Sequence, residues 1–186
     1  MSLSHAILGL LQWRPMTGYE LKTDYFDGSI AHFWPADQAQ IYRTLDKMTE
    51  QGWVESQIEY QEDRPNRKIY TLTDAGRTEL ARWLTTFQPL PVNREPFLIQ
   101  LFFANQLSNE TIIDLLDAQL KAHQELLAHY EAIPLARLDD PDINREQALQ
   151  RLTLELGLRI EQTYIDWIKA SIEVVRKLNA NSAEEN

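Results

Sequence analysis

Apolar residues near the start of the chain recur at helical spacing. Leu3, Ile7 and Leu10 lie three or four positions apart, which predicts a helix with one buried face. A proline interrupts this pattern, and Thr17 can cap a second helix that ends near an Asp-Gly pair. After a rigid aromatic-proline segment, the spacing predicts a third helix over about residues 36–51.

The period then changes from helical to alternating. Residues 53–60 and 68–72 are typical of strands, and the polar segment 61–67 between them contains Pro-Asn, which favours a hairpin with a long loop. A fourth helix is expected from Thr73-Asp74 through Leu84. Three helices, a hairpin and a helix, in this order, predict a winged helix-turn-helix.

Prolines at positions 89, 91 and 96 form the densest proline region of the chain and indicate a domain boundary. We therefore expect two domains, residues 1–88 and 89–186. The second domain is predicted to be helical throughout, with a short helix at 97–103, a long one capped by Ser108 or Asn109, and a final one from about Arg145 to Leu178. The expected fold class is mainly α, a winged helix-turn-helix followed by an all-α dimerisation domain.

The final helix carries two apolar stripes. The first consists of Leu149, Leu152, Leu156, Ile160, Tyr164 and Trp167. The second consists of Leu154, Leu158, Ile165, Ile168, Ile172 and Val175. A helix that packs on one neighbour needs only one stripe, so two stripes favour burial against the chain itself and against a partner. We assign the second stripe to a homodimer interface; a single large core around one central helix is the alternative.

The chain has 28 acidic and 18 basic residues in 186, a net charge of -10, which argues against binding nucleic acid through bulk electrostatics. The acids are unevenly distributed, because residues 1–90 sum to -3 and residues 91–186 to -7. No apolar run is long enough for a membrane helix, the start lacks the marks of a signal peptide, and there is no cysteine. These features predict a cytoplasmic protein without a membrane partner.

The third predicted helix offers chemistry suited to a DNA groove. Its core face contains Ile41, Leu45 and Met48, which leaves polar residues outward. The candidate DNA contacts on this helix are Gln38, Gln40, Tyr42, Arg43, Thr44 and Lys47. Gln pairs with adenine edges and Arg with guanine, while Thr and Lys reach bases or phosphates. Tyr42 either contacts a phosphate or packs beside its aromatic neighbours, and a merely solvated helix face is the plain alternative.

The predicted hairpin loop adds cations. Arg64, Asn66, Arg67 and Lys68 place three cations and an amide at the tip of the strand pair, where they suit a phosphate or the minor groove. Glu62 and Asp63 reduce the charge of residues 61–70 to +1. The basic patch is therefore real but small, and a soluble turn is the alternative.

An enzyme is not indicated. His5 and Ser4 are adjacent on a helix and do not face each other, and His123 and His129 point in different directions. The sequence contains no phosphate-binding glycine loop, HExxH or GxSxG motif. We expect no catalytic residue, no metal site and no cofactor.

Several motifs together resemble the PadR family of bacterial transcriptional regulators. In order, they are LSHAILGLL (3–11), MTGYEL (16–21), Phe33-Trp34, QIYRTL (40–45), QGWV (51–54), RPNRKIY (64–70) and TDAGR (73–77). The second half resembles the helical C-terminal domain of the longer subgroup of this family, beginning at Phe97-Leu98. Members of the family often carry proline where this chain has Arg43, which leaves the base preference open.

The resemblance implies a homodimer that binds a pseudo-palindromic operator in double-stranded DNA, usually as a repressor. It places residues 38–44 in the recognition helix and residues 64–68 in the wing. It also leaves room for a small aromatic effector, whose identity the sequence does not contain. The rival hypothesis is a winged-helix adaptor that binds proteins and no longer binds DNA.

Overall fold

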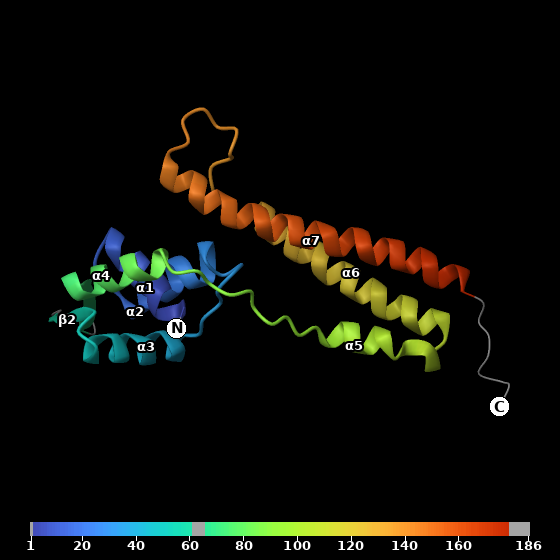
Figure 1. The fold of residues 1–186 in the computed structure, drawn as a ribbon, viewed down its shortest axis with the longest axis horizontal. Coiled ribbons are helices and arrows are strands. Elements are labelled where there is room, and N and C mark those ends of the chain that lie inside the picture. The colour runs from blue at the N-terminus through green and yellow to red at the C-terminus, as the bar shows by residue number, and fades with distance from the viewer. Residues whose placement is uncertain (1, 61–65, 179–186) are drawn as a thin grey trace. The chain divides into compact units, whose positions relative to one another are not determined.

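The computed structural model describes residues 2–60 and 66–178 of the chain. The chain divides into two compact units, Met1–Pro89 and Leu90–Asn186. Figure 1 shows a mixed unit of short helices and strands in blue to green, and a unit of helices in yellow-green to red. We call them the N-terminal unit and the C-terminal unit and describe each by itself.

The helices of the N-terminal unit begin where the sequence offers capping residues. They are α1 (Ser2–Trp13), α2 (Gly18–Glu20) continuing into the wider π-type helix η1 (Leu21–Ser29), α3 (Gln38–Glu50) and α4 (Asp74–Leu84). Thr17, Asp37 and Thr73 each accept a hydrogen bond from a backbone N–H in the first turn of the helix that follows. Gly52 has a φ of 70° directly after α3, a conformation that favours glycine.

The sheet of the N-terminal unit has three antiparallel strands in the order β1-β3-β2. They are β1 (Met16–Thr17), β2 (Val54–Glu59) and β3 (Arg67–Leu72), with Val54 opposite Leu72 and Glu59 opposite Arg67. The hairpin of β2 and β3 agrees with the sequence prediction, whereas β1 was not predicted, because two residues are too few to show an alternating pattern. The fold is the predicted winged helix-turn-helix.

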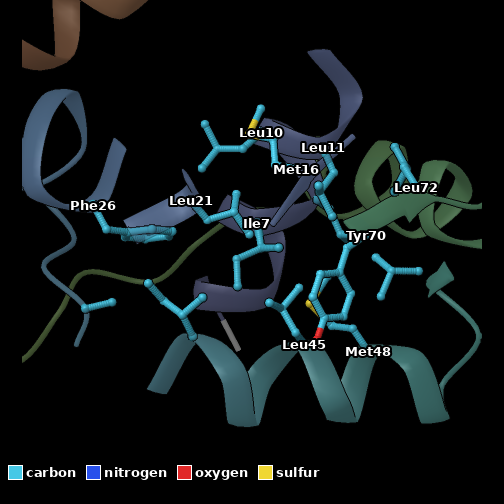
Figure 2. Close-up of a cluster of buried hydrophobic side chains, with 14 of the residues drawn as sticks. Ile7, Leu10, Leu11, Met16, Leu21, Phe26, Leu45, Met48, Tyr70 and Leu72 are labelled. Atoms are coloured by element: carbon cyan, nitrogen blue, oxygen red, sulfur yellow. The ribbon is translucent and has the colours of Figure 1, made fainter. Parts of the chain in front are cut away.

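One hydrophobic core holds the N-terminal unit together. Helix α1 contributes side chains on several sides, and Ile7 and Leu8 are fully buried. Leu45 and Met48 lie on α3 and face β3, where Tyr70 is buried (Figure 2). Because α3 is packed on this core through one face only, its opposite face is left to solvent.

In the described part of the C-terminal unit, all regular elements are helices. It contains α5 (Pro96–Phe102), the short 3-10 helix η2 (Ala104–Gln106), α6 (Asn109–Glu131) and α7 (Arg145–Lys177). Ser108 caps α6, and Asn144 caps α7 in a reciprocal capping box with Gln147. The Asn109 side chain donates hydrogen bonds to the carbonyls of Val175 and Leu178, so the start of α6 is joined to the end of α7.

A polar pair lies inside this antiparallel helix pair. His123 of α6 lies 2.6 Å from the Glu161 carboxylate of α7, measured from Nδ1 to Oε2, and Glu161 is only 7% exposed. The Tyr164 ring stacks on His123 with 4.4 Å between the ring centroids. The hydrogen bond explains how a carboxylate is accommodated in this core.

The structure corrects the assignment of the two stripes on α7. Leu154, Ile165, Ile168, Ile172 and Val175, expected at a subunit interface, are buried within their own chain, and Leu158 is half-buried. Leu149, Leu152, Leu156 and Ile160 of the first stripe are instead 43–61% exposed. Helical periodicity gives the number and direction of the stripes, but not the surface that each one meets.

No helix in the described part of the chain has the length and apolar character needed to cross a membrane.

Candidate nucleic-acid interface

The outward face of α3 is polar along its whole length. Ile41, Leu45 and Met48 point into the core, as the spacing predicts. The side chains of Gln38, Gln40, Arg43 and Lys47 are exposed, and Thr44 is half-buried. Positions 40, 43, 44 and 47 follow helical spacing and therefore share one face of α3.

Local hydrogen bonds restrain several side chains on this face. Gln40 Oε1 accepts from the Asp37 backbone N–H at 3.1 Å, as part of the capping box that begins α3. Arg43 Nε donates to the Ala39 carbonyl at 3.2 Å, and the Thr44 hydroxyl donates to the Gln40 carbonyl at 2.7 Å. Arg43 is thus held close to the helix through Nε, while the remaining N–H donors of its guanidinium group lie further from the backbone, on the two terminal nitrogens.

Tyr42 has a packing role. Its ring lies so close to Gly18 that a Cβ atom at that position would be 2.6 Å from the ring. The side chain is half-buried against the N-terminal core. Gly18 therefore permits α2 and α3 to approach each other. The contact with Gly18 and the half-buried position of Tyr42 favour the packing interpretation of this residue.

The wing root presents the remaining basic candidates. Asn66, Arg67 and Lys68 are exposed at the start of β3, next to the end of β2. Arg64 lies outside the described residues. The structure therefore brings the exposed face of α3 and the cations of β3 together within one unit.

The two described wing cations have acidic partners on the helix-turn-helix. Arg67 lies 3.0 Å from the Glu20 carboxylate of α2 and 3.8 Å from Glu59 of β2. Lys68 lies 3.7 Å from Asp46 on α3, and its ammonium group is 5.1 Å from the centre of the Tyr70 ring. Each cation thus connects the wing to a different helix.

Glu20 is held at both carboxylate oxygens. Its Oε2 accepts from the Thr17 backbone N–H at 2.7 Å and from the Thr17 hydroxyl at 2.8 Å, while Oε1 faces Arg67. Burial alone would raise the pKa of Glu20, but the hydrogen bonds with Thr17 and the neighbouring Arg67 bring it below its usual value. Glu20 is therefore a carboxylate at neutral pH.

Sequence reasoning missed Glu20 and Asp46 as parts of this region. Their partners, Arg67 and Lys68, lie more than twenty positions further along the chain, and only the folded hairpin brings the charged groups within 4 Å of each other. The motif MTGYEL contains Glu20, which was the one available signal.

Two other features bear on the chemistry. Within the described residues there is no group of three or more His, Asp or Glu side chains placed to hold a metal ion. His5 is buried, lies 2.9 Å from Glu79 and stacks on Trp83 with 4.6 Å between the ring centroids. These contacts join α1 to α4 and give His5 a structural role.

A helix with an exposed polar face, packed beside a hairpin wing, defines the winged helix-turn-helix class of DNA-binding proteins. The model of the PadR-like family of transcriptional regulators matches residues 7–82, and a model described as the C-terminal domain of virulence activator alpha matches residues 93–176. The negative transcriptional regulator PadR of Bacillus subtilis is 32% identical over 180 residues, covering 94% of this chain and 98% of that protein. The chain therefore belongs to the PadR-like family of transcriptional regulators.

Solved structures agree with this assignment over nearly the whole chain. Bacillus subtilis PadR in complex with operator DNA has a TM-score of 0.82 at 31% identity, covering 94% of this chain and 99% of that one. The same protein in complex with p-coumaric acid has a TM-score of 0.75 at 30% identity, covering 95% and 100%. The Vibrio cholerae virulence activator AphA has a TM-score of 0.73 at 32% identity, covering 94% and 98%. Like its relatives, this chain is a transcriptional regulator and not an enzyme.

Proposed function

We propose that this regulator is a homodimeric repressor that binds a pseudo-palindromic operator through α3 and the wing. In this proposal residues 1–88 bind DNA and residues 89–186 form the dimer. The observation that carries it is the exposed face of α3, where Arg43 and Lys47 lie on one side of a helix that is anchored on the other. A relative of similar length has been crystallised with operator DNA, which supports DNA binding by this chain.

The residue types on α3 suit different parts of a duplex. The Arg43 guanidinium has the geometry to bind the O6 and N7 acceptors of guanine, and the exposed Gln38 amide suits an adenine edge. Lys47 lies one turn beyond Arg43 and is suited to a phosphate. Thr44 is half-buried, and its hydroxyl already donates a hydrogen bond within α3, so we expect its methyl group to contribute more to DNA contact than its hydroxyl.

The dimer is proposed from the apolar stripe that the chain leaves uncovered. Leu149, Leu152, Leu156 and Ile160 form a continuous exposed row on the first half of α7. A row of this kind is typical of a surface that a second subunit covers. A two-fold dimer would present two copies of α3 to half-sites about one DNA turn, or ~34 Å, apart.

We also propose that a small aromatic molecule modulates DNA binding. The support is the complex of Bacillus subtilis PadR with p-coumaric acid, a molecule of this class. Adding p-coumaric acid to the DNA complex of this protein is expected to release the DNA, whereas a non-aromatic carboxylic acid of similar size is not. An unchanged complex at saturating p-coumaric acid would count against this class of effector.

The test of DNA binding is a gel shift with the region upstream of the protein's own gene, at low and moderate salt. Arg43→Ala is expected to weaken binding by about tenfold and to relax base preference, since one bidentate contact contributes about 1–3 kcal/mol. Lys47→Ala should weaken all duplexes alike and reduce the salt slope by about 0.9. Arg176→Ala, which removes an exposed cation from α7, is the matched control and should leave binding unchanged.

The second candidate, a protein-binding adaptor, is favoured by one observation, the net charge of -10. Absence of a shift at both salt concentrations, with a folded protein, would favour the adaptor over the repressor. A shift that Arg43→Ala and Lys47→Ala both weaken would eliminate it.

A further inference from the structure

The wing cations are not isolated charges. Arg67 and Lys68 are 42% and 45% exposed, so each retains surface that a phosphate could approach. Yet each already faces a carboxylate of the helix-turn-helix, Glu20 at 3.0 Å and Asp46 at 3.7 Å. A phosphate that binds either cation must therefore displace the carboxylate or bind next to a negative charge.

Among the described residues that are ion-paired around Arg67, the acids outnumber the bases. Arg14 lies 3.5 Å from Glu20 and 3.4 Å from Asp24, so it shares the same acidic group with Arg67. Counting Glu59, which lies 3.8 Å from Arg67, the connected set has two cations and three carboxylates. Within the described residues, the ion-paired set at the root of the wing is therefore slightly negative, although the loop sequence alone suggested a small basic patch.

The second carboxylate stands on the recognition helix itself. Asp46 is exposed and lies between Arg43 and Lys47 in the sequence. Its carboxylate, on α3, faces the ammonium group of Lys68 on β3. It is thus paired with one of the cations proposed to contact DNA and belongs to the same helix as two others. No core contact requires an acid at this exposed position, because the buried face of α3 consists of apolar side chains.

We propose that Glu20 and Asp46 act as internal counter-charges that compete with DNA phosphate for Arg67 and Lys68. They weaken the sequence-independent part of DNA binding, which depends on cations that release counterions from the duplex. The regulator then depends more on the fit of α3 in the groove than on general attraction to DNA. This inference rests on the proposed DNA-binding function and concerns the affinity for DNA of any sequence.

The chemistry of the two acids supports this role. Thr17 anchors Glu20 through Oε2, while Oε1 of Glu20 faces Arg67. The carboxylate therefore cannot turn away when a phosphate approaches Arg67. The pairs also join the wing to α2 and α3, which holds the hairpin beside the recognition helix before DNA is present. The competition is a permanent property of the folded unit and needs no ligand.

The test measures binding of full-length protein to a labelled duplex of random sequence, by fluorescence anisotropy over a range of salt concentrations. Glu20→Gln and Asp46→Asn are each expected to bind this duplex about 2- to 5-fold more tightly, the range that an exposed ion pair allows. Each should also steepen the salt slope by up to about 0.9, because one more cation becomes available to phosphate. Glu20→Gln keeps the cap of α2, since glutamine serves at this position of a capping box.

Two controls separate this mechanism from simple loss of negative charge. Glu55→Gln removes one exposed carboxylate from β2, at the position opposite Thr71. Within the described residues the Glu55 carboxylate makes no ion pair with Arg67 or Lys68. This variant should therefore change the affinity for DNA much less. In an Arg67→Ala background, Glu20→Gln should have a much smaller effect, because the nearer of its two cationic partners is gone and only Arg14, at 3.5 Å, remains. Thermal unfolding of each variant shows whether the unit is intact.

The outcomes are distinct. Equal gains for Glu55→Gln, an unchanged or weakened affinity in both Glu20→Gln and Asp46→Asn, or a full effect of Glu20→Gln without Arg67 would each overturn the inference and leave the proposed function standing. A wild-type protein that binds neither its own upstream region nor the random duplex would overturn the DNA-binding proposal and this inference with it.

Discussion

The two units bury their apolar side chains in different ways. In the N-terminal unit, helices and a sheet surround α1, and its residues Ile7 and Leu8 have no exposed surface. In the C-terminal unit, α6 and α7 share one buried seam that includes Leu116 and Ile168, while the opposite side of α7 exposes an apolar row. The first unit closes its core with its own elements, although single aromatic side chains such as Trp13 and Tyr19 remain exposed, whereas the second leaves a row of apolar side chains uncovered along α7.

The difference predicts that the two units owe their free energy of unfolding to different contacts, within one chain in the first unit and partly with a second copy in the other. The N-terminal unit should lose stability when its core is disturbed, whatever the protein concentration. The C-terminal unit, under the proposed dimer, draws part of its stability from a second copy, which makes that part dependent on concentration.

The largest effect is expected from a cavity in the N-terminal core. Leu45 is fully buried on α3, and Leu45→Ala should lower the free energy of unfolding of this unit by about 2–5 kcal/mol. Urea unfolding at two protein concentrations measures the loss, which should be the same at both. A loss that grows on dilution would mean that this core also depends on a partner.

A second, smaller effect on folding is expected from the exposed row of α7. Leu152→Asp combined with Leu156→Asp should convert the dimer to a monomer, because two charges would be buried without partners in an apolar interface. Analytical ultracentrifugation checks this, and the unfolding midpoint of the wild type should fall on dilution towards that of the variant.

The control for the row is Gln162→Asp, which adds a charge at an exposed position on another side of the same helix. It should leave the sedimentation coefficient unchanged. If the double Asp variant sediments like the wild type, the dimer surface lies elsewhere and the exposed row needs another explanation.

The smallest effect is a pH dependence confined to the N-terminal unit. Hydrogen bonds with Arg82 and His5 lower the pKa of Glu79 from 4.5 to about 2. Because the folded pKa is depressed, this carboxylate contributes stability above pH 4.5 that is lost as the pH falls towards about 2. Glu79→Gln should remove this part of the acid destabilisation.

Thermal unfolding followed by tryptophan fluorescence between pH 6 and pH 2 measures this effect, since Trp53 and Trp83 lie close to His5. The wild type should lose more of its melting temperature than Glu79→Gln over this range. Parallel curves for the two proteins would show that the Glu79 pair does not contribute to stability.

The sequence predicted the elements well because their signals are local. Thr17, Ser108 and Thr73 cap the helices that the spacing predicts, and the change of period locates the hairpin. The winged helix-turn-helix and its family were likewise available from motifs that follow one another in order. By contrast, the strand β1 has only two residues and exists because β3 lies beside it.

The candidate interface was predicted in part. The exposed face of α3 follows from helical spacing, because the positions of Ile41, Leu45 and Met48 determine which side is buried. The role of Tyr42 depended on its contact with Gly18, which no local pattern contains. The sequence predicted a small basic patch at the wing, but it did not reveal that Glu20 and Asp46, from other elements, pair with Arg67 and Lys68.

The main helices, the β2–β3 hairpin, the polar face of α3 and the family could be predicted from the sequence, because each depends on neighbours a few positions apart or on ordered motifs. The tertiary structure alone decided which stripe of α7 the chain covers and which acids meet Arg67 and Lys68. Both are long-range pairings. Periodicity defines the direction of a side chain along its own element, whereas its partner depends on how separate elements pack together.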